Sequence, residues 1–138
     1  MIWKHKPELE VINNMMKNTL VEHLGIEIIE IGDDYIKATM PVDSRTKQPM
    51  GLLHGGASVA LSESIGSVAG VLIVDDIMKE QIVGVEINAN HLKTVRGGKV
   101  TSVTKPVRIG RKIQVWNTDI YNDEEELVCT SRLTTTRV

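Results

Sequence analysis

A single carboxylate stands in a long apolar stretch of this chain. The twenty residues from Gly55 to Val74 are apolar or small, and Glu63 is the only charged one among them. Burying an unpaired carboxylate costs several kcal/mol unless the group is paired, hydrogen-bonded or neutralised. Glu63 is therefore either a functional group or a side chain that reaches solvent or a neighbouring Lys or Arg.

The residues that accompany Glu63 favour a functional interpretation. Ser67 follows four residues later, on the same face of a helix. His54 and Gly55 lie where this helix should begin, and a helix start presents unpaired N–H groups that stabilise a developing negative charge. A carboxylate near such a group can activate water as a general base or attack as a nucleophile.

The stretch that carries Glu63 predicts a buried helix. It is apolar on all sides, and such a helix must be buried. Gly66 and the β-branched Val59 and Val68 would make it a poor helix in isolation. Tertiary packing must therefore hold it.

Strand-like runs surround this helix in the sequence. A hairpin is expected from Leu24–Ile31 and Tyr35–Val42, joined by Gly32-Asp33-Asp34. Four more strands are expected over Gln81–Leu92, Lys99–Ile109, Lys112–Asn122 and Glu126–Arg137, and a short amphipathic helix over residues 8–20. Antiparallel strands that meander around one buried helix make an α+β fold. No linker or repeat interrupts the pattern, so we expect a single domain over residues 1–138.

Composition excludes several classes of protein. A net charge of −2 and a pI near 6.1 give no support for nucleic-acid binding. The glutamate and the many small residues of the central helix argue against a membrane span. Lone Cys129 and the absence of a secretory signal favour the cytoplasm. The four histidines show no zinc spacing, so we expect no metal, and no cofactor is indicated.

Basic residues cluster in one part of the chain. Between His91 and Trp116 there are seven Lys and Arg residues and no acidic one. A solvated strand face with basic turns explains most of them. The more specific hypothesis is that these basic residues bind a phosphorylated ligand, because Arg and Lys form charge-assisted hydrogen bonds with phosphate.

The segment Gln48–Gly56, followed by Glu63 and Ser67, resembles the hotdog-fold acyl-CoA thioesterases of the phenylacetate-degradation and 4-hydroxybenzoyl-CoA thioesterase group. The resemblance covers essentially the whole chain and includes Thr39–Lys47, Val85–His91 and Ser131–Thr134. Within the group, these segments are most similar to the enzymes that hydrolyse 1,4-dihydroxy-2-naphthoyl-CoA in menaquinone synthesis. The resemblance implies hydrolysis of an aromatic acyl thioester, carried by CoA or by an acyl carrier protein.

The resemblance also implies a hotdog fold, in which an antiparallel sheet wraps a long central helix, and a homodimer that pairs into a homotetramer. Spacing gives an independent reason for the dimer. Gly55 and Glu63 are eight residues apart, about 12 Å along a helix, so both cannot readily touch one carbonyl. Two helices packed antiparallel across a twofold axis would bring Gly55 of one chain to Glu63 of the other, giving two composite sites.

The resemblance assigns roles to the motif residues. The Gly55 N–H would stabilise the oxyanion, and Glu63 would act as general base or nucleophile. Ser67 and Gln48 would hold water or orient the carboxylate, while His54 would orient the substrate carbonyl or the loop. Structural alternatives remain open: a tight turn for Gly55, a bond from Ser67 back to a helix carbonyl, and a structural role for His54.

A second set of residues would hold the substrate. For the CoA phosphates and pantetheine, the hypothesis names His91, Lys93, Arg108 and Arg111. The acyl pocket should lie between paired helices near Met50 and Val68. The modest size of the Val68 side chain would leave room for a bicyclic ring.

Two other functions compete with hydrolysis. A hotdog dehydratase or hydratase also combines His with an acidic residue, but the long His-Gly-Gly approach and the Glu63–Ser67 pair fit hydrolysis better. A non-catalytic acyl-CoA binding module or sensor would be favoured by loss of Glu63 or by an attached DNA-binding helix pair, and the sequence has neither feature.

Overall fold

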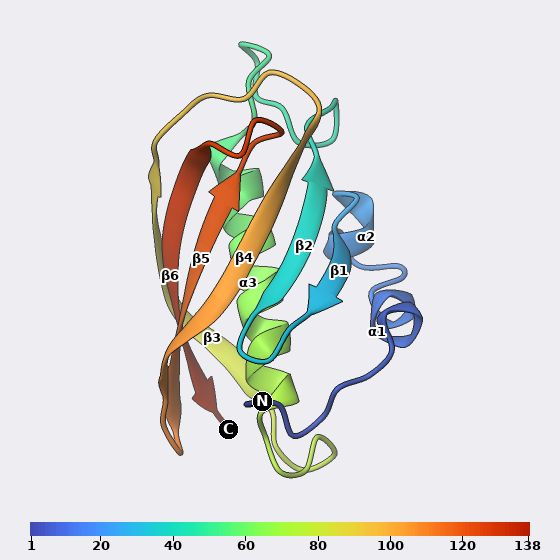
Figure 1. The fold of residues 1–138 in the computed structure, drawn as a ribbon, viewed down its shortest axis with the longest axis vertical. Helices are drawn as coiled ribbons and strands as arrows, with labels where there is room; N and C mark the ends of the chain where they lie inside the picture. Colours follow the sequence, from blue (N-terminus) through green and yellow to red (C-terminus); the bar gives the residue numbers. More distant parts are fainter.

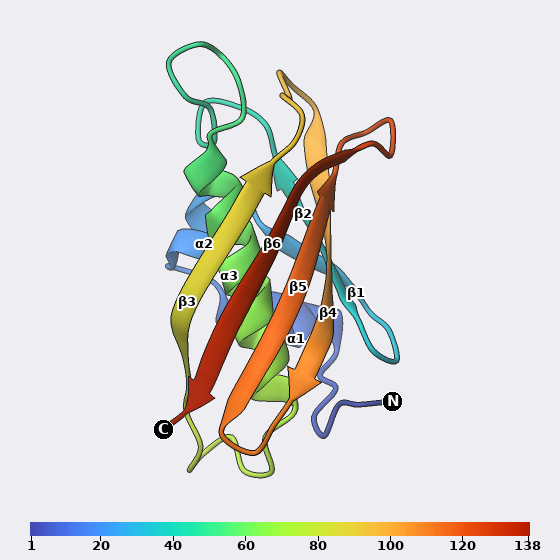
Figure 2. The same cartoon turned by 90° about the vertical axis from the view of Figure 1, so that its left-hand side faces the viewer.

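Six strands form one sheet in the computed structural model, which describes residues 1–138. Across the sheet the order is β1 (Glu27–Ile31), β2 (Ile36–Pro41), β4 (Lys99–Ile109), β5 (Ile113–Tyr121), β6 (Leu127–Arg137) and β3 (Ile82–His91). Every neighbouring pair is antiparallel. The sheet wraps around helix α3 (Gly55–Leu72), as Figures 1 and 2 show. The expected α+β hotdog arrangement is confirmed.

Strand β3 does not follow the expected meander. It pairs with β6 at the far edge of the sheet, whereas β4, the next strand in the chain, lies between β2 and β5. Alternating hydrophobicity identifies a strand but not its neighbour, because any strand with a buried face can pair at either edge. The β1–β2 hairpin was predicted correctly, with Ile31 opposite Ile36 across the turn.

Helix α3 packs closely on the sheet through its glycines. A Cβ at Gly66 would lie 2.6 Å from Leu133 Cδ2, and a Cβ at Gly70 would lie 2.8 Å from Ile82 Cγ2. These contacts leave no room for larger residues, which explains the small side chains in the helix.

The prediction that α3 is buried on all sides is wrong for the single chain. One sheet covers only part of the helix surface, so nine of its residues are buried and a stripe that borders the edge strand β3 is not. The stripe comprises Gly56, Ala60, Glu63, Ser64, Ser67 and Val71. By length and composition alone α3 could span a membrane, yet half of its residues are buried inside the structure.

The N-terminal helix is shorter than expected. It divides into α1 (Leu9–Met15) and α2 (Leu20–His23), because Asn18 adopts a left-handed φ of 62° and Thr19 is extended. Asn13 on α1 hydrogen-bonds to both backbone groups of Ile28, with each distance 2.9 Å. Helix α1 thereby covers the β1 edge of the sheet, whereas the β3 edge is free.

Candidate active site

The loop that leads into α3 is fixed by its own hydrogen bonds. The buried Thr46 hydroxyl donates to the Pro41 carbonyl at 2.7 Å, and the Thr46 carbonyl accepts the His54 N–H at 2.8 Å. The Arg45 guanidinium hydrogen-bonds to Asp43 and lowers the pKa of that carboxyl to about 2. The loop thus sets the position from which His54 opens the helix.

His54 is the N-cap of α3. Its Nδ1 accepts the Gly56 N–H at 2.7 Å, so the neutral imidazole carries its proton on Nε2. The N–H of Gly55, the first residue of the helix, has no acceptor in the chain. This free N–H lies at the positive end of the helix dipole, where an anionic oxygen is favoured.

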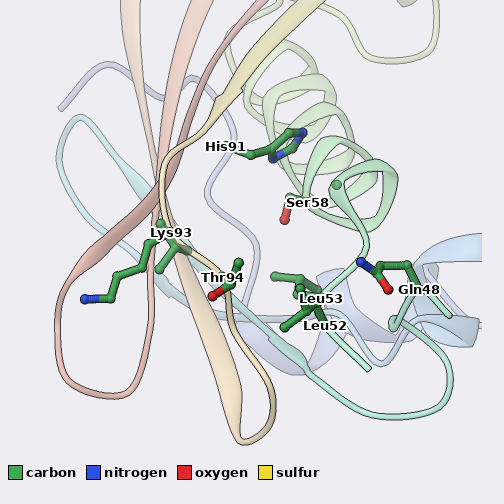
Figure 3. Close-up of a pocket in the computed structure, with 9 residues that line it drawn as sticks. Gln48, Leu52, Leu53, Ser58, His91, Lys93 and Thr94 are labelled. Carbon is green, nitrogen blue, oxygen red and sulfur yellow. The ribbon is translucent and has the colours of Figure 1, made fainter. Parts of the chain in front are cut away.

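A cavity of about 220 Å³ opens beside this helix start (Figure 3). Its lining residues are Gln48, Leu52, Leu53, Gly55, Ser58, His91, Lys93, Thr94 and Val128. Gln48 Oε1 accepts the Met50 N–H, which turns the side-chain nitrogen of Gln48 toward the cavity (Figure 3). The cavity therefore combines hydrogen-bond donors with an apolar wall.

Strand β3 supplies the opposite side of the cavity. The imidazole of His91, at the end of the strand, lies against Gly55, since a Cβ at that glycine would stand 2.7 Å from His91 Nε2. Lys93 follows two residues later and forms an ion pair with Glu126. Four of the predicted residues, Gln48, Gly55, His91 and Lys93, thus line one cavity.

Glu63 does not line this cavity. Its side chain is half-buried on the uncovered stripe of α3, and it has neither a hydrogen-bond nor an ion-pair partner in the chain. Ser67 lies one turn further on the same stripe, and no hydrogen bond joins it to Glu63. A neighbouring Lys or Arg therefore does not explain this carboxylate, and a single chain keeps it apart from the Gly55 N–H.

Met50 and Val68 lie far apart within one chain. Met50 is 74% exposed on the loop before the helix, whereas Val68 packs against the core thirteen residues after Gly55, about 20 Å along the helix axis. A pocket formed by both residues would require a second chain.

Arg108 and Arg111 lie at the end of β4 and in the following turn, and both are exposed. Because β3 and β4 run in opposite directions, this turn is at the other end of the sheet from His91 (Figure 2). One chain therefore does not bring the four predicted CoA-binding residues together.

Sequence reasoning missed five of the cavity residues. Leu52 and Leu53 lie within the motif segment, and Ser58 follows His54 by one helical turn, so local spacing could have identified them. Thr94 and Val128 carry no local signal. They reach the cavity only because the segment after β3 pairs with β6, where the Leu92 N–H donates to the Val128 carbonyl at 2.8 Å. No group of three His, Cys, Asp or Glu side chains is arranged to hold a metal ion.

Comparison with known proteins identifies a matching family and several similar relatives. Residues 50–129 match the model of the thioesterase superfamily. The 1,4-dihydroxy-2-naphthoyl-CoA hydrolase of Escherichia coli is 54% identical over 135 residues, 98% of each chain. The proofreading thioesterase EntH of Cronobacter turicensis is 51% identical over 135 residues, 98% of this chain and 97% of the relative. The crystal structure of a Haemophilus influenzae thioesterase has a TM-score of 0.96 and 53% identity, covering 100% of this chain and 95% of the other.

Proposed function

The chain belongs to the thioesterase superfamily, and from that premise we propose that it hydrolyses an aromatic acyl-CoA, 1,4-dihydroxy-2-naphthoyl-CoA, in cytoplasmic menaquinone synthesis. Thioester hydrolysis is the activity that the matching relatives are named for, and the chain is an acyl-CoA thioesterase. The naphthoyl substrate rests on the 54% identity to the Escherichia coli hydrolase. The sequence does not distinguish a CoA thioester from a carrier-protein thioester, so the latter is a second substrate form to test.

The observation that carries the mechanism is the free N–H of Gly55 at the cavity. In thioester hydrolysis the carbonyl oxygen gains negative charge as water or a carboxylate attacks. A backbone donor aimed at that oxygen can lower the barrier by about 3 kcal/mol. His54 fixes this helix start through its bond to the Gly56 N–H, and Gln48 offers a second donor beside it.

Glu63 either activates the nucleophile or is itself the nucleophile in this proposal. It acts as a general base on water, or attacks the carbonyl itself and forms a mixed anhydride that water then cleaves. Ser67, one turn along the same stripe, orients the carboxylate or the water. The half-buried, unpaired state of Glu63 supports this role, because a carboxylate without a partner is free to accept a proton.

The site is complete only in a dimer. Gly55 and Glu63 are about 12 Å apart along α3, so we propose that antiparallel helices from two chains bring one of each to the same thioester. Two surfaces support this arrangement: the uncovered stripe of α3, and the β3 edge, which has no neighbour while Asn13 covers the β1 edge. Two dimers would then form the proposed tetramer.

The same pairing would assemble the substrate-binding residues. Met50 of one chain could approach Val68 of the partner and form the acyl pocket between the helices. The basic Arg108 and Arg111, distant from His91 and Lys93 within one chain, would meet the CoA phosphates only across an interface between chains.

Steady-state hydrolysis by the wild type and by Glu63→Gln tests the proposal. The substrates are 1,4-dihydroxy-2-naphthoyl-CoA, benzoyl-CoA and a fatty acyl-CoA, with a carrier-protein thioester as a fourth. We expect the aromatic CoA thioesters to be cleaved best and the variant to lose roughly a hundredfold or more in kcat while it remains folded. A wild type that binds these thioesters and cleaves none would instead indicate a binding module or sensor.

A further inference from the structure

Gly84 on β3 lies directly beside the carboxylate of Glu63. A Cβ at Gly84 would stand 2.7 Å from Glu63 Oε1, closer than real Cβ atoms approach an oxygen. The next nearest atoms, Glu63 Cδ and Leu133 Cδ1, are each 3.7 Å away, which is ordinary contact. The carboxylate is therefore the group that lies closest to the space left by the missing side chain.

The backbone does not require a glycine here. The glycines with left-handed φ are Gly25, Gly51 and Gly98, and Gly84 is not among them. A glycine inside a strand weakens it, and where conformation does not require one it marks the close approach of another group. At Gly84 that group is the side chain of Glu63.

The strand is also irregular at this position. The register between β3 and β6 shifts between Gly84 and Glu86, so Val85 forms a bulge. Bulges change the direction of a strand locally and occur often beside active sites. The bulge and the glycine together set how closely β3 approaches the uncovered stripe of α3.

We propose that Gly84 is a positioning residue. Because it has no side chain, the Glu63 carboxylate can lie against β3, and from that position it reaches the thioester. This inference rests on the proposed catalytic role of Glu63. A methyl group at position 84 would displace Oε1 without disturbing the core, because the crowded atom is the end of a flexible side chain. Displacement of a catalytic group by about 1 Å can reduce turnover about a hundredfold.

The test compares three glycine-to-alanine variants in steady-state hydrolysis of the best aromatic CoA thioester, together with Tm. Gly84→Ala should lower kcat at least about tenfold, change KM less than about threefold and leave Tm unchanged or higher. Gly97→Ala, where a Cβ meets nothing within 4 Å, should keep wild-type kinetics. Gly66→Ala, which crowds buried Leu133, should lower Tm instead.

A double-mutant cycle with Glu63→Asp shows whether Gly84 acts through the carboxylate. The aspartate side chain is one methylene shorter and leaves the space above position 84 open. Adding Gly84→Ala to Glu63→Asp should therefore reduce kcat far less than it does in the wild type.

Three results would overturn this role for Gly84 while leaving the proposed function standing: wild-type kcat in Gly84→Ala, an equal loss in both backgrounds, or a Gly84→Ala protein that does not fold. Full activity in Glu63→Gln would overturn the proposed catalytic role of Glu63 and this role with it. A wild type without thioesterase activity would overturn the proposed function itself.

Discussion

The imidazole of His91 occupies the space that a side chain on Gly55 would need. A Cβ at Gly55 would lie 2.7 Å from His91 Nε2, so the last residue of β3 touches the first residue of α3. Strand and helix run in opposite directions, with Ile82 beside Gly70 and Gly84 beside Glu63 further along. One edge strand therefore borders both the helix start and the proposed catalytic carboxylate.

Gly55→Ala should lower kcat by about a hundredfold, because a methyl group against His91 would shift the N–H that we assign to the oxyanion. The double variant Gly55→Ala/His91→Ala removes the obstruction and should regain part of this kcat, even if KM rises. Stopped-flow or steady-state kinetics on one aromatic thioester measure both effects. Wild-type kcat in Gly55→Ala would contradict the assignment.

Ser64→Arg should prevent dimer formation. Ser64 lies on the uncovered stripe of α3, where a long side chain would be forced between two closely packed helices. Sedimentation equilibrium should give the monomer mass for the variant, together with loss of thioesterase activity. Met78→Arg, at a position 88% exposed beyond the helix, is the matched control and should keep the wild-type mass.

Charge reversal at Arg108 and Arg111 should raise KM for CoA thioesters at least about tenfold while changing kcat by less than about twofold. Each charge-assisted hydrogen bond to phosphate contributes roughly 1.5–3 kcal/mol, and a tenfold change in binding needs about 1.4 kcal/mol. Lys17→Glu, on the exposed segment between α1 and α2, controls for the change in net charge of each single reversal. Unchanged kinetics would remove both arginines from the CoA site.

Val68→Met should weaken hydrolysis of the naphthoyl thioester relative to the benzoyl thioester. The longer side chain would fill part of the proposed acyl pocket, and small volume changes in an apolar pocket shift discrimination by about 1–3 kcal/mol. The measurement is the ratio of kcat/KM for the two substrates. An unchanged ratio would place the ring elsewhere.

Local pattern was sufficient to identify most secondary structure and much of the site. The Glu63 stretch indicated the central helix, and the start and end of α3 lie within two residues of the prediction. The positions of His54 and Gly55 indicated a helix start that favours an anion, and the family resemblance added Gln48. In the structure, His54 caps the helix, and Gln48 and Gly55 line the cavity beside its first turn. Such features depend on neighbours in the chain, so the sequence displays them directly.

Other features depend on pairing between distant segments. The position of β3 beside β6 decides that His91, Thr94 and Val128 meet at one cavity and that Gly84 lies beside Glu63. Periodicity predicted one helix over residues 8–20. The structure interrupts this helix at residues 18 and 19, because Asn18 adopts a left-handed conformation.

The sequence by itself determined the central helix, its lone carboxylate, its glycine-rich start and the strands around it, since propensity and periodicity are local properties. Only the tertiary structure decided which edge strand meets that helix, which face of the helix one sheet leaves uncovered, and where a missing side chain makes room for Glu63. Those outcomes follow from close packing between segments far apart in the chain, where a contact of less than 3 Å means that even a methyl group must displace a neighbouring atom.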